Sequence, residues 1–169
     1  MTTPRNQTSG STSKSKTKAP LDAIEMLKED HRKVEELFAA YEKEKNNKKK
    51  WNIVDQICTE LTVHAQLEET SFYPLVQEAL GEEEASLVDE ASVEHASLKW
   101  LIEQLQREDV DAPLHEAKVT VLKEYVAHHV KEEEKEMFPK VKKSDIDIVE
   151  LAETLRAARE KIISKLTAN

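Results

Sequence analysis

Apolar residues return at intervals of three and four along most of this chain, and this spacing limits its fold more than any other feature. Such intervals bring side chains to one face of a helix, whereas a half-buried strand alternates at every second residue. Tight β-hairpins also rely on glycine, and the 169 residues contain only two. The sequence therefore predicts an all-α protein, with a core large enough to fold without cross-links.

Four helical stripes and one further helical segment lie beyond the N-terminal stretch 1–20. The stripes cover residues 24–41, 54–68, 88–105 and 115–133, and polar or proline-containing stretches separate them. Connections this short favour an up-down-up-down four-helix bundle. The further segment starts at Ser144, a residue type that is common at helix N-caps, and adds a C-terminal helix. We therefore expect a bundle over residues 21–143 and an appended helix over residues 144–169.

The N-terminal stretch 1–20 differs in composition from the rest of the chain. It is rich in Ser, Thr and Lys, contains no acidic residue and carries four of the 25 basic side chains. Residues 21–169 therefore hold 21 basic against 34 acidic side chains, a net charge of −13. We expect residues 1–20 to form a disordered tail, because they have little apolar surface to bury; a transit peptide, the alternative, would carry more Arg and an apolar face. The acidic remainder disfavours nucleic acid or an anionic membrane as a partner.

Cys58 is the only cysteine of the chain. One cysteine allows neither an intrachain disulfide nor a zinc or iron–sulfur site built from several thiolates, so a metal site would need nitrogen and oxygen ligands. No apolar run approaches the length of a membrane span, and the N-terminus lacks the apolar stretch of a secretory signal. These features predict a soluble, cytoplasmic protein in which Cys58 is a small buried apolar residue.

The chain contains an internal repeat. His64, Glu68 and Pro74 recur further along as His129, Glu133 and Pro139, all at one constant separation. His31 recurs as His95 at a separation that is shorter by a single position, and the neighbouring apolar positions recur with it. Two helical hairpins related by a pseudo-twofold axis would produce this pattern.

Four histidines occupy positions where Leu or Ile would ordinarily pack. In an antiparallel hairpin, residues equidistant from the turn lie at the same height, because both helices rise about 1.5 Å per residue. The midpoints between successive histidines fall in or next to the predicted turns, so all four histidines reach one level of the bundle. Each His-x-x-x-Glu spacing adds a glutamate one turn away on the same inward face. The six converging residues are His31, His64, Glu68, His95, His129 and Glu133.

A buried set of this kind requires a cation or another source of neutralisation, because burying unpaired carboxylates is costly. Six nitrogen and oxygen ligands exceed the four that zinc needs, and two carboxylates able to bridge suit a pair of iron or manganese ions. The alternative is a metal-free bundle in which the glutamates satisfy the core histidines.

The arrangement resembles the hemerythrin-like family, the HHE cation-binding domains, over residues 22–143. The resemblance rests on a single His in the first and third helices, on His-x-x-x-Glu before Phe-Tyr-Pro in the second, and on His-x-x-x-Glu before Met-Phe-Pro in the fourth. It implies that His31, His64, His95 and His129 bind two iron ions in an Fe–O–Fe type site. It also implies that Glu68 and Glu133 bridge these ions.

The chain departs from the oxygen-carrying members of this family at two positions. Those carriers have a second His one turn after the histidine of the third helix, where this chain has Lys99. Their second carboxylate stands one position further from its His than Glu133 stands from His129. These differences disfavour reversible oxygen transport, and the resemblance then points to nitric oxide or peroxide handling, iron repair, or iron and oxygen sensing.

Three functions follow as hypotheses. The first is a non-haem di-iron protein that binds or reduces a small oxidant, namely O2, peroxide or NO, in stress defence or sensing. The second is a module that senses iron or oxygen, or stores iron, without significant turnover. The third is a structural bundle without physiological metal. The sequence leaves open whether the chain is an enzyme and which protein it contacts.

Several residues near the six have competing interpretations. Glu35, Glu60, Lys99 and Tyr125 lie one turn from a histidine, so each is either a partner behind the metal ligands or a solvated flank. His128 points about 100° away from His129 and is expected at the surface or behind the ligands, and His115 is expected to cap a helix or to be exposed. Apolar neighbours are expected to restrict water at the site; these are Val34, Leu61, Leu98 and Val126.

Overall fold

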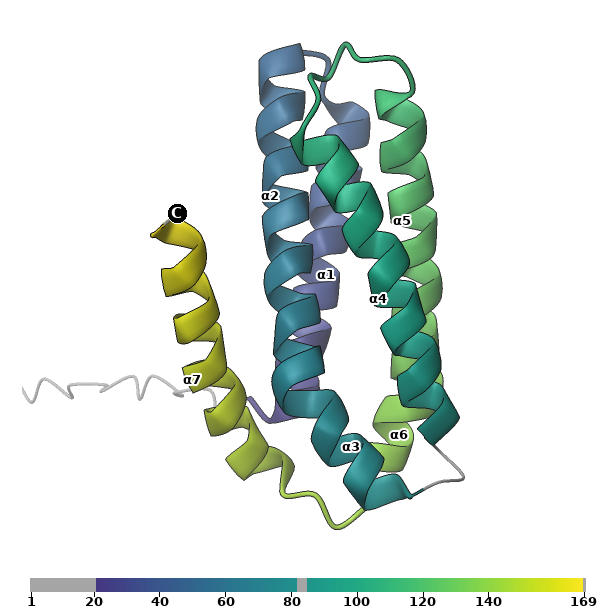
Figure 1. Cartoon of the computed structure of the whole chain (residues 1–169), viewed down its shortest axis with the longest axis vertical. Helices are drawn as coiled ribbons and strands as arrows, with labels where there is room; N and C mark the ends of the chain where they lie inside the picture. Colours follow the sequence, from purple (N-terminus) through teal and green to yellow (C-terminus); the bar gives the residue numbers. More distant parts are fainter. Residues whose placement is uncertain (1–20, 82–84, 169) are drawn as a thin grey trace, which may run out of the picture.

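The computed structural model describes residues 21–81 and 85–168, and all regular structure in these ranges is helical (Figure 1). Four long helices lie side by side as an up-down-up-down bundle, as the sequence predicts. The predicted N-terminal tail lies outside the described residues. The bundle helices are α1 (Ala23–Lys43), α2 (Asn47–Leu67), α4 (Ala85–Gln106) and α5 (His115–Glu132).

The first hairpin is defined by side-chain caps at the start of both helices. Asp22 accepts a hydrogen bond of 2.9 Å from the backbone N–H of Glu25 and starts α1. Asn46 accepts one of 3.1 Å from Lys49 N–H and starts α2 directly after the short turn. Asn46 marks the point at which the chain reverses, and this point determines the height of His31 relative to His64.

Each half of the bundle contains one π-helical turn at the same place in the repeat. These turns are η1 (Glu68–Phe72) and η2 (Glu133–Met137), and they lead into α3 (Tyr73–Leu80) and α6 (Phe138–Val141). Pro74 and Pro139 follow directly, as second residues of α3 and α6. Pro74 does not end the helix: the π turn precedes the proline, and α3 continues to Leu80, where Gly81, with a φ of 73°, ends it.

The appended helix α7 (Ile148–Thr167) begins later than predicted. Asp147, not Ser144, is the N-cap, and it accepts hydrogen bonds of 3.0 Å from Val149 N–H and Glu150 N–H. The Ser144 hydroxyl instead donates to the carbonyl of Val141, 2.8 Å away, at the end of α6. The helix then packs against α1, α2 and η1, outside the four-helix bundle (Figure 1).

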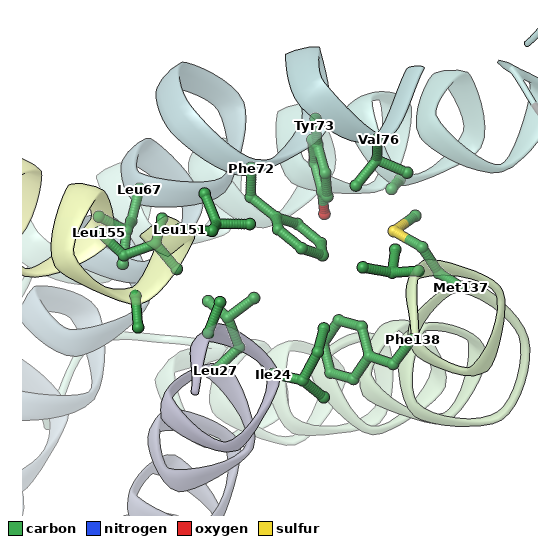
Figure 2. Close-up of a cluster of buried hydrophobic side chains, with 14 of the residues drawn as sticks. Ile24, Leu27, Leu67, Phe72, Tyr73, Val76, Met137, Phe138, Leu151 and Leu155 are labelled. Carbon is green, nitrogen blue, oxygen red and sulfur yellow. The ribbon is translucent and has the colours of Figure 1, made fainter. Parts of the chain in front are cut away.

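Buried apolar side chains form two clusters, one on each side of a polar layer. The first joins the ends of the bundle helices to α7 and includes Ile24, Phe72, Phe138 and Leu155 (Figure 2). The second fills the opposite half of the bundle, where Cys58 is buried as predicted. None of the helices in the described part of the chain has the length and apolar character needed to cross a membrane.

Candidate metal centre

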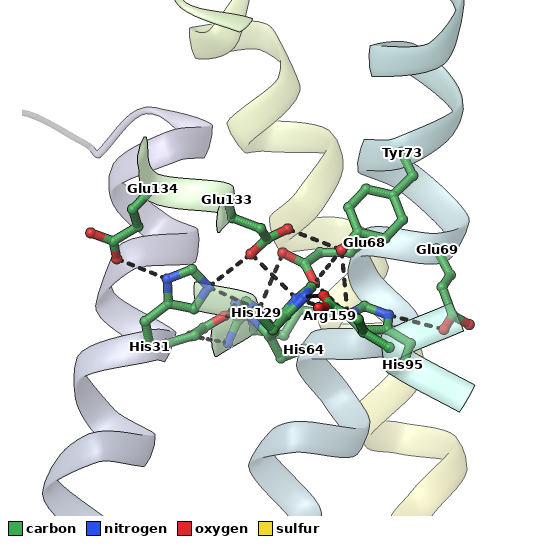
Figure 3. Close-up of polar contacts among 12 residues, drawn as sticks. His31, His64, Glu68, Glu69, Tyr73, His95, His129, Glu133, Glu134 and Arg159 are labelled. Carbon is green, nitrogen blue, oxygen red and sulfur yellow. Dashed lines mark hydrogen bonds and ion pairs between the residues drawn. The ribbon is translucent and has the colours of Figure 1, made fainter. Parts of the chain in front are cut away.

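The polar layer consists of the six residues singled out by spacing, and all six are buried (Figure 3). The histidines form two pairs, one from each half of the repeat. The Nε2 atoms of His31 and His64 lie 3.2 Å apart, and those of His95 and His129 lie 3.1 Å apart. Four imidazole nitrogens from four helices therefore face one another across the axis of the bundle.

Each glutamate contacts one histidine of each pair. The Glu68 carboxylate lies 3.1 Å from His64 Nε2 through one oxygen and 3.4 Å from His95 Nε2 through the other. One oxygen of Glu133, Oε2, lies 3.2 Å from His31 Nε2 and 3.5 Å from His129 Nε2. Both carboxylates thus span the two halves, which is the position that a ligand shared by two ions needs.

The residues present fit a pair of metal ions. Glu68 Oε1 and Glu133 Oε2 are buried without a hydrogen bond of acceptable geometry, although imidazole nitrogens lie close to them. A nitrogen separation of 3.1–3.2 Å also suits two imidazoles at adjacent positions of one ion, with bonds of about 2.1 Å. Two groups of buried residues could each hold an ion. The first group consists of His31, His64, Glu68 and Glu133. The second group consists of Glu68, His95 and His129.

Four carboxylates hold the outward-facing nitrogens of the histidines; we call them the outer carboxylates. Each lies on a different helix from the histidine that it contacts, and together they link α1 to α2, α2–η1 to α4, α4 to α5, and η2 to α1. A carboxylate at Nδ1 favours the tautomer with hydrogen there and leaves Nε2 free to bind a cation. The contacts are Asp30 to His64 (3.3 Å), Glu69 to His95 (3.1 Å), Glu94 to His129 (2.7 Å) and Glu134 to His31 (2.9 Å).

The outer carboxylates were missed in the sequence, although the repeat marks them. Asp30 and Glu94 directly precede His31 and His95, and Glu69 and Glu134 directly follow Glu68 and Glu133. Asp30 therefore recurs as Glu94 at the same sequence separation at which His31 recurs as His95, and Glu69 recurs as Glu134 just as Glu68 recurs as Glu133. This repetition of acidic residues could have identified the outer carboxylates from the sequence.

The four residues considered as partners behind the ligands lie further out than the outer carboxylates. Lys99 reaches the site indirectly, because its amino group lies 2.6 Å from both oxygens of Glu69. Glu60 pairs with Lys33 at 2.5 Å, on the outside of α1 and α2. Glu35 is exposed, and 49% of the Tyr125 surface is accessible to solvent, which matches a solvated flank.

The other two histidines lie away from the central six. His128 was expected at the surface or behind the ligands, and its position agrees with both. It is exposed and contacts Glu132 at 3.0 Å, and its Nε2 also lies 3.5 Å from Glu94, one of the outer carboxylates. His115 was expected to cap a helix or to be exposed; it is the first residue of α5, whose N-cap is Leu114, and it is buried. The loop between α4 and α5 folds back over it, and Glu108 lies 3.2 Å from its Nδ1.

Charge at the centre is balanced between histidines and glutamates. Burial opposes the charged form of His64, but the Glu68 carboxylate and the hydrogen bond with Asp30 outweigh burial and raise its pKa well above the usual value. The same competition, with Glu133 and Glu94 as partners, raises the pKa of His129 to about 9. Burial would raise the pKa of Glu68, but the neighbouring His64 and His95 hold it well below its usual range.

Tyr73 is a further buried polar group at this centre, and the sequence analysis did not assign it to the site. Its hydroxyl donates to Glu133 at 2.9 Å and lies 3.4 Å from Glu68 and 3.3 Å from His95 Nε2. Burial and the two carboxylates raise the pKa of this phenol far above its ordinary value, so it stays protonated. The matching position in the other half is Phe138, whose ring stacks on His31 at 5.8 Å. The two halves therefore differ chemically at this level.

A cavity of about 20 Å³ adjoins the four histidines. Its volume is close to that of one or two water-sized molecules. The four apolar residues predicted beside the histidines all line it, together with Ile102. On the His31 side, a groove of about 570 Å³ between α1 and α5 reaches the surface, and basic residues lie along it: Arg32, Lys123, Lys131 and Lys135.

Fold and geometry define a helical bundle with a buried centre of the cation-binding type. The sequence model of the hemerythrin HHE cation binding domain matches residues 22–141. The chain therefore belongs to the hemerythrin HHE cation-binding domain family, as the sequence resemblance indicates.

Two known proteins are similar to this chain. A hemerythrin HHE cation binding domain-containing protein from Mycobacterium kansasii has a similar structure, with a TM-score of 0.72 and 26% identity, over 88% of this chain and 93% of that one. A DNA nickase from Nostoc sp. strain PCC 7120 is 30% identical over 152 residues, which are 88% of this chain and 42% of the nickase. The chain thus spans less than half the length of that relative.

Proposed function

We propose that this protein binds two iron ions through the four histidines and two glutamates, and that the site binds or reduces a small oxidant such as O2, peroxide or NO. The observation that carries the proposal is the position of Glu68 and Glu133. Each contacts one histidine of each pair, so each is placed to be shared by two ions. Manganese, which accepts the same donors, is the second candidate metal.

The size of the cavity supports a small ligand. About 20 Å³ beside the histidines is room for a diatomic molecule or peroxide. Its apolar lining limits water at the site, which strengthens electrostatic interactions there. Bound iron would supply redox chemistry and coordination positions for the oxidant.

The chain's own groups would orient the site and control protons. The outer carboxylates hold the Nδ1–H groups and keep the Nε2 atoms directed inward. The Tyr73 hydroxyl is the hydrogen-bond donor that lies between the two glutamates. It can donate to an oxygen atom placed at the centre without itself becoming charged.

Metal content is the first test. Protein produced with iron available should contain about two iron ions per chain and show the visible absorption of an oxo-bridged pair, which changes with air or peroxide. Less than a tenth of an ion per chain in a folded, helical protein would contradict the proposal. In that case the metal-free structural bundle would be the better interpretation.

Turnover distinguishes an enzyme from a sensor or store. Catalytic loss of peroxide or NO should occur in the iron-loaded protein and disappear in His64→Ala. Glu103→Gln should retain it, because Glu103 is exposed and pairs with Arg107 on the surface of α4. Slow turnover in protein that retains its iron would favour the sensing or storage alternative.

We do not extend DNA nicking from the Nostoc relative to this chain. Residues 21–169 carry a net charge of −13, and nucleic-acid binding depends largely on neutralising phosphates with basic side chains. A nicking assay on supercoiled DNA with the iron-loaded protein tests this choice, and cleavage that is lost in His64→Ala would reverse it.

A further inference from the structure

Helix α7 lies outside the residues matched by the family model, yet it contributes a side chain to the surroundings of the metal centre. Arg159 Nη1 donates to Asp30 Oδ1 at 2.9 Å, and Nη2 donates to Oδ2 of the same carboxylate. Asp30 Oδ2 also accepts from His64 Nδ1 at 3.3 Å. Two hydrogen-bonded steps therefore connect α7 to a predicted metal ligand; Figure 3 labels the two ends of this path, Arg159 and His64.

The basic side chain that contacts Asp30 is more buried than those near two other outer carboxylates. Glu69 pairs with Lys99, whose side chain is 47% exposed, and Glu94 faces His128, whose side chain is 59% exposed. The Arg159 side chain is 24% exposed, and that of Asp30 is 13% exposed. A two-point guanidinium–carboxylate contact that is largely shielded from water is stronger and more directional than a surface contact.

We infer that Arg159 is a positioning residue of the metal centre, and that docking of α7 and binding of metal at His64 strengthen each other. The inference rests on the proposed function, because it requires that the central six hold metal. Arg159 fixes the orientation of Asp30, and Asp30 fixes the ring of His64. A cation at Nε2 makes the opposite N–H of the ring a stronger donor and so tightens the same contacts from the other end. Coupling of this kind is reciprocal in free energy.

The Arg159 contact has to be separated from the docking of α7 in general. The helix also docks through buried apolar side chains, Leu151, Ala152, Leu155 and Ile162. Arg156, one turn before Arg159, donates to the backbone carbonyl of Leu21 at 2.6 Å and also holds α7 on the bundle. This contact does not involve the central six or an outer carboxylate, so Arg156→Gln is a matched control.

The first experiment compares ferrous iron affinity by competition with a chelator. Loss of a partner behind a metal ligand typically lowers affinity about 10–100-fold. Arg159 is one hydrogen bond further from the metal than such a partner, so we expect Arg159→Gln to lower the affinity for iron about tenfold. Arg159→Lys should recover part of this affinity, and Arg156→Gln should change it less than twofold. Arg159→Lys keeps the test usable if Arg159→Gln loses its helical signal.

The second experiment measures amide hydrogen exchange in α7 with and without iron. In the wild-type chain and in Arg156→Gln, iron should slow exchange by the same factor of about ten, whereas Arg159→Gln should show no such effect. Equal iron affinities for the two glutamine variants would overturn the coupling and leave the proposed function standing. The same holds if iron does not change amide exchange in α7 of the wild-type chain. A wild-type chain that takes up no iron would overturn the proposed function as well.

Discussion

Metal binding at this centre is expected to displace about two protons per chain at neutral pH. In the metal-free chain, neighbouring carboxylates outweigh burial and raise the pKa of His64 well above its usual value and that of His129 to about 9. Each ring must lose a proton before its Nε2 can bind an ion. Glu68 adds no proton, because its pKa is lowered and it is already ionised.

The magnitude follows from linkage between protons and metal. Displacing two protons means that affinity rises about 100-fold per pH unit while both rings are protonated. The slope should decrease as the pH passes about 9, where His129 has already lost its proton. The expected signature is therefore a steep rise in affinity from pH 7 that flattens in alkaline solution.

Calorimetric titration of metal in two buffers with different ionisation heats, at pH 7.5, measures the released protons directly. His129→Ala should release about one proton fewer. Glu103→Gln should behave as the wild type, because Glu103 is exposed and pairs with Arg107 on the surface of α4. Tight metal binding with release of less than half a proton per chain would refute the reasoning.

The same protonation governs the stability of the metal-free chain. A pKa raised in the folded state contributes stability that is fully present below the unfolded value, near 6.5, and is lost as the pH rises through the folded value. The melting temperature without metal should therefore fall between pH 6.5 and about 9, the window set by His129. An increase over this interval would contradict the sign of both histidine shifts.

Three further predictions concern the surroundings of the centre. Glu94→Gln should weaken metal binding about 10–100-fold in chelator competition, because it removes the charge at His129 Nδ1, while Glu60→Gln should bind normally. Leu155→Ala should lower the unfolding free energy in urea by about 2–5 kcal/mol, because Leu155 is fully buried, whereas exposed Ile163→Ala should change it by less than about 0.5 kcal/mol. Cys58 should resist a thiol reagent at pH 8 until the protein unfolds, because burial raises the pKa of its thiol to about 12; fast labelling of folded protein would disprove this.

The positions of the central six could be predicted because they depend on helical spacing alone. A residue's height in a hairpin follows from its distance to the turn, and its face follows from steps of three and four. His64 and Glu68 obey both rules, and their repeat copies obey the same rules in the other hairpin. The bundle was predictable for the same reason.

The outer carboxylates could not be derived in this way, because each bonds to a histidine of another helix. Which neighbour Asp30 reaches depends on the rotation of α1 relative to α2, and helical periodicity does not determine this rotation. Tyr73 was missed for a different reason. Regular α-helical steps would place Phe72 on the same face as Glu68, one turn further along the helix. The π turn contains one more residue, so Tyr73 takes this place and reaches the centre instead.

Helix start positions that the periodic spacing of apolar residues does not determine could not be predicted reliably. Ser144 and Asp147 are both good N-cap residues, and the choice between them depends on how the chain leaves α6. The burial of His115 depends on a loop that folds back over the helix start. Such features arise from tertiary contacts between segments rather than from local spacing.

The two π turns also determine how symmetric the centre is. A π turn contains one residue more than the α turn it replaces. The π turn begins at the inward glutamate in both halves, and a proline follows at the same distance. Tyr73 and Phe138 therefore take corresponding places beside the centre. A single hydroxyl group on one of these rings is enough to make the two ends of an otherwise symmetric site unequal.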